Sequence, residues 1–170
     1  MKTLLMALVT MSLSVNYAQT FNIDTDAAVV NFNYLSEETT GTITNVTATI
    51  KLNLLDLATS KIEGKADVNS LSTGNPARDK HLKSKTYFNV GEFPIIKFTS
   101  NSIKLVGDHY EASGTINMKG FTKPVVFTIM VSGETLTLTT SIFADDFGLA
   151  IKKGKETSVV EIEVVLPASK

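Results

Sequence analysis

Charged, aromatic and turn-forming residues crowd together in residues 73–100, whereas elsewhere polar and apolar residues tend to alternate. Arg78, the only arginine of the chain, lies in this stretch beside His81. Arg78 could donate hydrogen bonds to a phosphate, carboxylate or carbonyl oxygen of a ligand. The same side chain could instead tie a local helix to a sheet. The sequence leaves both roles open, and we take Arg78 and His81 as candidates for the mouth of a binding site.

Catalysis and metal binding find little support in the sequence. His81 and His109 are the only imidazoles, and their spacing matches no zinc-binding motif, so a surface or capping role is favoured. The adjacent carboxylates at residues 145–146 would point to opposite faces of a strand. The chain has neither the GxSxG motif of serine hydrolases nor a P-loop. We therefore predict no catalytic residue, no metal site and no enzymatic activity.

A short helix around residues 76–84 must carry Arg78 and His81. Asn75 can accept a hydrogen bond from a free backbone N–H, and Pro76 suits the first helical position because it has no N–H to leave unpaired. From residue 95 onward, branched and aromatic residues predict a strand. A helix inserted once among strands would act as a plug or lid on a sheet structure.

Residues 1–18 show the three regions of a secretory signal peptide. Lys2 supplies the positive start, residues 4–15 supply an apolar segment too short to span a bilayer, and Ala18 supplies a small residue for cleavage. We therefore expect a periplasmic or secreted protein in which residues 19–170 form a single domain.

The composition excludes several classes of protein. Residues 1–18 contain one of the 16 basic residues and none of the 17 acidic ones, so the remaining chain has a formal charge of −2. This balance argues against nucleic-acid binding, which needs a clustered positive surface. The chain has no cysteine, so neither disulfides nor thiol catalysis are available. We expect no stable membrane insertion, because no stretch after the signal is long and apolar enough for a membrane helix.

Hydrophobic residues recur with a period of two from residue 27 onward. Residues 61–68 are the clearest case, since one face carries Ile62, Gly64, Ala66 and Val68 and the other only charged residues. A strand of this kind is buried on one side. About eight such strands, separated by short turns, predict an all-β antiparallel barrel or a sandwich. We favour the barrel, because its closure removes exposed strand edges.

The predicted inner face mixes small residues with large apolar ones. Small residues on several strands favour a cavity, although a packed core in which small and large side chains interdigitate carries about equal weight. If there is a cavity, its apolar wall is predicted to comprise Phe32, Tyr34, Ile50, Ile62, Ala66, Phe98, Tyr110, Ile116, Phe127, Ile129, Leu138 and Ile162.

The sequence resembles the YceI-like family of polyisoprenoid-binding proteins. Residues 73–100 carry TGN, RDKHLKS, YF, FP and IKFTS in the order and with the gaps of the family's most characteristic segment. Residues 113–125, SGTINMKGFTKPV, are similar to its second signature, and residues 146–149, DFGL, to its third. The family usually has Arg two residues before the Asp of the third signature, where this chain has Ala144. The resemblance covers almost all of residues 19–170.

The resemblance implies a lipocalin-like eight-stranded barrel that is exported to the periplasm and encloses a long apolar cavity. It implies a non-enzymatic role with an isoprenoid chain as ligand, and it favours a cavity over the packed core. We therefore predict a lipid-binding protein that holds an isoprenoid-like or other long apolar chain, with an isoprenoid or quinone lipid as the candidate ligand and no other cofactor. The alternative is a periplasmic stress or partner-binding protein with a filled core that acts through its outer surface. A homodimer is left open. If the missing Arg normally contacts a head group, that contact is absent here.

Overall fold

A computed structural model describes residues 19–53, 55–149 and 154–168, in which ten strands form one antiparallel sheet. Residues 1–18, with the predicted signal peptide, lie outside this description. The strands are β1 (Gln19–Phe21), β2 (Val29–Tyr34), β3 (Thr39–Ile43), β4 (Val46–Leu52), β5 (Lys61–Asp67), β6 (Ile95–Val106), β7 (His109–Met118), β8 (Phe121–Ser132), β9 (Thr135–Phe143) and β10 (Val159–Pro167). The helices are α1 (Pro76–Lys83) and the 3₁₀ helices η1 (Leu35–Glu37), η2 (Leu57–Thr59), η3 (Val68–Ser70), η4 (Ala144–Phe147) and η5 (Lys155–Ser158).

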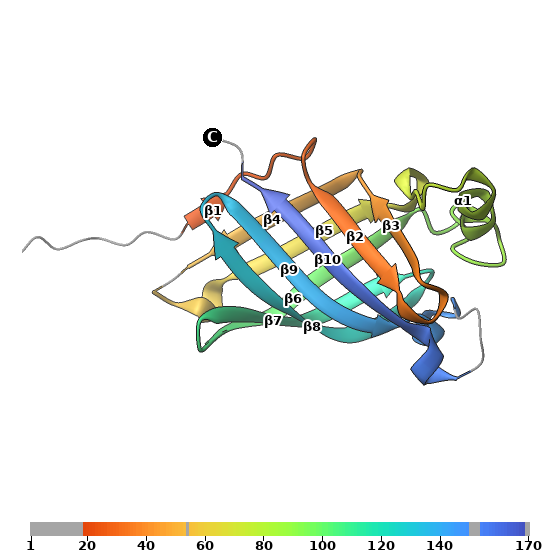
Figure 1. Cartoon of the computed structure of the whole chain (residues 1–170). Coiled ribbons are helices and arrows are strands. Elements are labelled where there is room, and N and C mark those ends of the chain that lie inside the picture. The colour runs from red at the N-terminus through yellow and green to blue at the C-terminus, as the bar shows by residue number, and fades with distance from the viewer. Residues whose placement is uncertain (1–18, 54, 150–153, 169–170) are drawn as a thin grey trace, which may run out of the picture.

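The sheet curls into a barrel, as predicted (Figure 1). Neighbours follow the order β1-β4-β5-β6-β7-β8-β9-β10-β2-β3, so the last long strand, β10, returns to pair with β2 near the start of the chain. β3 runs through residues 44–45 directly into β4, which pairs with β5 on the other side. The chain therefore joins β3, at one end of the sheet order, to β4, which lies beside β1 at the other end.

The predicted strand count of eight is corrected to ten, because β1 and β3 are additional short strands. β1 pairs with β4 at Phe21 and Ile50, while β2 pairs with β3 at Val30 and Ile43. Residues 22–29 therefore lie opposite residues 44–49. Because the first segment is longer than the second, the hydrogen-bond ladder between the two parts of the chain is interrupted there. If β1 with β2, and β3 with β4, are each counted as one interrupted strand, the barrel has the predicted eight.

Helix α1 covers one end of the barrel (Figure 1). It begins as predicted, because the Asn75 side chain accepts hydrogen bonds from the backbone N–H groups of Ala77 and Arg78 at 3.1 Å each, and Pro76 follows as the first helical residue. No residue of α1 is buried. Among the described residues, no helix is long and apolar enough to cross a membrane.

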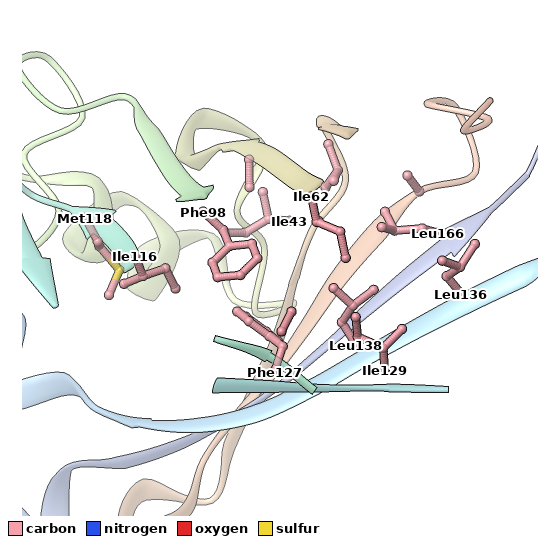
Figure 2. Close-up of a cluster of buried hydrophobic side chains, with 14 of the residues drawn as sticks. Ile43, Ile62, Phe98, Ile116, Met118, Phe127, Ile129, Leu136, Leu138 and Leu166 are labelled. Carbon is pink, nitrogen blue, oxygen red and sulfur yellow. The ribbon is translucent and has the colours of Figure 1, made fainter. Parts of the chain in front are cut away.

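The opposite end of the barrel is closed by packing. Ile50, Ile129, Leu136 and Leu166 are each at most 2% exposed there. Nearer the middle, the rings of Phe98 and Phe127 meet edge to face with 4.8 Å between their centroids (Figure 2). The core is thus dense at one end and interrupted toward the end that α1 covers.

Candidate functional site

An apolar chamber of about 440 Å³ lies beneath α1, at the covered end of the barrel. Leu82, Tyr87 and Phe88 line it from the inserted helical segment. Strands β2, β3, β6, β7, β9 and β10, together with η3, η4 and their adjoining residues, contribute Val30, Phe32, Tyr34, Ile43, Leu71, Ile96, Met118, Ile142, Ala144, Leu149, Val160 and Ile162. We call this space the mouth chamber. Its volume lies within the range of small-molecule sites in proteins.

A second, smaller chamber of about 100 Å³ lies deeper in the barrel. We call it the inner chamber. The two chambers lie next to each other, since five residues line both: Val30, Ile43, Ile96, Met118 and Ile162. We call the two adjacent chambers together the passage; it starts under α1 and ends at the packed end. The packed-core alternative from the sequence therefore describes only the closed end.

Most of the predicted wall residues line this passage. Phe32 and Tyr34 line the mouth chamber, and Ile162 lines both chambers. The inner chamber is lined by Ile62, Ala66, Phe98, Ile116, Phe127 and Leu138. As ligand contacts these residues remain predictions.

Three predicted wall residues lie outside both chambers. Ile50 and Ile129 are 0% and 2% exposed and belong to the packed end, and Tyr110 pairs with Ile129 across β7 and β8. These side chains belong to the core or pack against it, as predicted, but they sit too far along the strands to reach the cavity.

Arg78 holds the helix in place. Its Nε–H donates to Thr73 Oγ1 at 2.8 Å, one terminal nitrogen donates to the Thr73 carbonyl at 3.1 Å, and the other donates to Thr39 Oγ1 at 3.4 Å. These bonds join α1 to β3 and to the residues before the helix, which is the structural role considered from the sequence. Arg78 also lines the mouth chamber, so its side chain is both a tie and part of the rim.

Asp79 completes this cluster from the next helical position. Its Oδ1 accepts hydrogen bonds from the Thr73 backbone N–H at 2.8 Å and from the Thr73 hydroxyl at 2.5 Å. Partial burial pushes the pKa of Asp79 upward, but the two hydrogen bonds from Thr73, together with the charge of Lys83 and the Ser72 side chain, outweigh it and leave the pKa below its ordinary value. Thr73 thus accepts from Arg78 and donates to Asp79, which orients both charged groups.

His81 lies at the rim of the mouth chamber. Its ring packs against Tyr87 with 4.8 Å between the centroids and a tilt of 59°, and both side chains line the chamber. Among the described residues no group of three or more His, Cys, Asp or Glu could hold a metal ion. His81 thus lies in the chamber lining, and its contact with a ligand stays a prediction.

Sequence reasoning missed several lining residues. Glu37 and Thr39 bring polar atoms to the mouth chamber from the β2–β3 turn, which showed no signal beyond its polarity. Leu82 and Leu149 lie in the family-like segments, where their apolar character among polar neighbours was a usable signal. Ala144 is 4% exposed and lines the mouth chamber, so the absence of the family's usual Arg leaves this wall small and uncharged.

Two glycines on the inward-facing strands differ in the space around them. A Cβ on Gly64, which lines the inner chamber, would meet only the Thr47 carbonyl oxygen at 4.0 Å. A Cβ on Gly114 would overlap the carbonyl oxygen of Thr99 and approach the Ser100 Cα to 2.8 Å. Gly114 is required by close packing between β6 and β7, whereas Gly64 leaves open space in the passage.

A family model and similar curated proteins point to the same family. The YceI-like domain model matches residues 21–168. A UPF0312 protein of Photorhabdus laumondii is 40% identical over 77 residues, which cover 45% of this chain and 40% of that protein. Protein YceI of Salmonella arizonae is 33% identical over 94 residues, covering 55% and 49%. The matched segments thus span less than half the length of these curated relatives.

Solved structures share the fold at low sequence identity. BcnA of Burkholderia cenocepacia superposes with a TM-score of 0.76 at 21% identity, covering 87% of this chain and all of that one. The YceI protein of Campylobacter jejuni gives 0.63 at 19% identity, with 100% and 99% covered. A domain of Saccharophagus degradans described as polyisoprenoid-binding gives 0.58 at 13% identity, with 90% and 100% covered.

Proposed function

From the premise that this chain belongs to the YceI-like family, we propose that it is a lipid-binding protein whose passage takes up one long apolar tail. The tail enters under α1, fills the mouth chamber and ends in the inner chamber. An isoprenoid or quinone tail is the proposed ligand, and the Saccharophagus degradans domain described as polyisoprenoid-binding supports this class.

The adjacency of the two apolar chambers carries this proposal. Both are lined mainly by aliphatic and aromatic side chains, and five residues are common to them. Each methylene group that leaves water contributes roughly 0.8 kcal/mol, so a tail of several isoprene units gains enough to offset the loss of its own freedom. A branched chain suits a wall built from branched and aromatic side chains.

The polar head is proposed to stay at the mouth, beside Arg78, His81 and Glu37, since these bring charged and polar groups to a chamber that is otherwise apolar. Three of the hydrogen-bond donors of Arg78 are already engaged with Thr73 and Thr39, and a carboxylate lies on the same rim. A neutral alcohol or carbonyl head fits this rim better than a phosphate, whose charge would need free cationic donors.

We propose that the protein acts outside the cytoplasm, after removal of residues 1–18, and that it stores or carries the lipid without altering it. The basis is the signal-like pattern of residues 1–18 and the lack of a visible catalytic apparatus in the sequence. A soluble carrier of this kind would shield an apolar tail from water between membranes.

Native mass spectrometry tests the proposal directly. The protein is expressed in its native compartment, purified without detergent, and measured before and after solvent extraction. We expect an additional mass of a prenyl alcohol or quinone that extraction removes. A bare protein that also takes up neither added prenyl alcohols nor added quinones would contradict the proposal.

A further inference from the structure

A hollow of about 920 Å³ lies on the outer face of the sheet, over β8, β9, β10, β2 and β3, and Phe32 and Ile162, which line the mouth chamber, also border it. The strand register places short polar side chains on this face in two rows that run across the strands. The first row is Thr42, Asn31, Glu163, Thr139 and Thr128; the second is Thr40, Asn33, Glu161 and Ser141. We call this surface the polar groove.

The geometry of the polar groove suits an extended ligand. Neighbouring strands lie about 4.8 Å apart, so the first row, which crosses five strands, is roughly 19 Å long. The two rows are two residues apart along each strand, which corresponds to roughly 6.8 Å. Ser72, Thr73 and Gly74 add lining residues beside β3. The platform is long and narrow; its two rows present hydrogen-bonding groups at regular intervals, and Val126, 48% exposed, adds one apolar side chain to the lining.

Two amide–carboxylate pairs stand at the centre of the rows. Asn31 Nδ2 donates to Glu163 Oε2 at 2.8 Å, and Asn33 Nδ2 donates to Glu161 Oε2 at 3.1 Å. An amide has a second N–H, and a carboxylate has further lone pairs, so each pair retains both a donor and an acceptor. Neighbouring hydroxyls of a sugar match this arrangement, since one can donate to the carboxylate while the other accepts from the amide.

The composition of the polar groove narrows the class of ligand. Among the described residues that line it, none is Lys or Arg, although the chain has 16 such residues. An anionic ligand would therefore meet two carboxylates and no cation. Short Ser, Thr and Asn side chains lose less conformational entropy on binding than Lys.

We propose that the polar groove binds a neutral oligosaccharide that lies across the strands, with its hydroxyls paired to the two amide–carboxylate pairs. The polar side chains of this site lie on the opposite face of the sheet from the lipid passage, while Phe32 and Ile162 border both spaces.

Nuclear magnetic resonance titration of the purified protein tests this site. The probes are cellohexaose, xylohexaose and chitohexaose, with an oligogalacturonate of the same length as the anionic comparison. We expect saturable shifts with at least one neutral hexasaccharide, centred on the side-chain amides of Asn31 and Asn33 and on the backbone amides of β2 and β10, which remain measurable in variants of these two residues. The oligogalacturonate is expected to leave these signals unchanged.

The double variant Asn31→Ala with Asn33→Ala should lower the affinity roughly tenfold or more, because it removes a donor from each pair. The matched control is Ser113→Ala with Thr115→Ala on β7, outside the polar groove, which should bind like the original protein. The proposal is overturned if no neutral hexasaccharide shifts these amides up to its solubility limit. It is equally overturned if both double variants bind alike, or if the signals move with protein concentration alone, which would assign the face to a second copy of the chain.

Discussion

Replacement of Gly64 by valine should stabilise the protein and weaken lipid binding at the same time. Gly64 faces the inner chamber from β5, and its backbone needs no glycine-specific conformation. The new Cβ meets no atom closer than 4.0 Å, so the rest of the side chain can extend into empty space between Ala48 and Phe98, the cross-strand neighbours of Gly64. A valine there occupies the volume that the end of a tail would fill.

The expected gain in stability combines two terms. Glycine within a strand costs roughly 0.5–1 kcal/mol through its greater freedom in the unfolded chain. Burial of the valine methyl groups adds roughly 1 kcal/mol after allowance for the partial exposure of this position. We therefore expect an increase of about 1–2 kcal/mol in the free energy of unfolding, which corresponds to a rise of roughly 3–6 °C in Tm.

Thermal unfolding followed by circular dichroism gives the stability, and competition with a fluorescent prenyl probe gives the affinity. A tail that loses access to the inner chamber forfeits about three methylene groups, which corresponds to a loss of affinity of roughly fiftyfold at 0.8 kcal/mol each. The matched control is Gly114→Ala, where the added methyl group overlaps the Thr99 carbonyl oxygen and should destabilise the barrel.

Two results would refute this reasoning. A destabilised Gly64→Val protein would mean that the inner chamber is not open space. A stabilised protein that binds the probe as before would mean that the tail does not reach the inner chamber, and the binding site would then be confined to the mouth chamber.

Three further perturbations test the elements around the mouth. Lys119→Met removes the Nζ bonds to the carbonyl oxygens of Gly148 at 2.8 Å and Thr86 at 3.4 Å; we expect a loss of about 1–2 kcal/mol in unfolding and faster release of a prenyl probe in stopped-flow measurements. Phe147→Ala empties a position that is 1% exposed and should cost about 3–5 kcal/mol in urea unfolding, whereas an effect below 1 kcal/mol would contradict its place in the core. The pKa of Asp79 is lowered in the folded protein, so its stabilising effect is present above the unfolded value of about 3.9 and is lost as the pH falls through the folded pKa. Asp79→Asn should therefore flatten the acid side of the stability profile below about pH 4, and an unchanged profile would show that Thr73 does not favour the ionised form.

Strands in which apolar and polar residues strictly alternate were predictable from the sequence, and so was the start of the helix. Residues 61–68 show one apolar and one charged face, and β5 follows them closely. Asn75 and Pro76 mark the helix because their side-chain chemistry fits only its first turn. β1 and β3 were not predictable, because runs of three and five residues are too short to show a period and owe their pairing to the partner strands.

The sequence predicted which side chains point into the barrel, but not how far along the barrel axis each of them lies. Alternation indicates that Ile50 and Ile129 point inward, and both are buried. Their position along the barrel axis depends on strand tilt and register, which the periodicity does not contain. The mouth chamber is lined by segments that are distant in the sequence, such as Leu82 of α1 and Ala144 and Leu149 after β9, and no local pattern reports that they come together.

The pairing of β10 with β2 governs the order in which the barrel can form. Val30 pairs with Val164, so the ladder that closes the barrel joins residues near the two ends of the described chain. During synthesis β2 has no partner for this edge until β10 has emerged, and β9 waits for the same strand. Contacts so distant in sequence form slowly, and open edges invite association with other chains. A chain shortened before residue 159 would expose both edges, and we expect it to aggregate rather than fold.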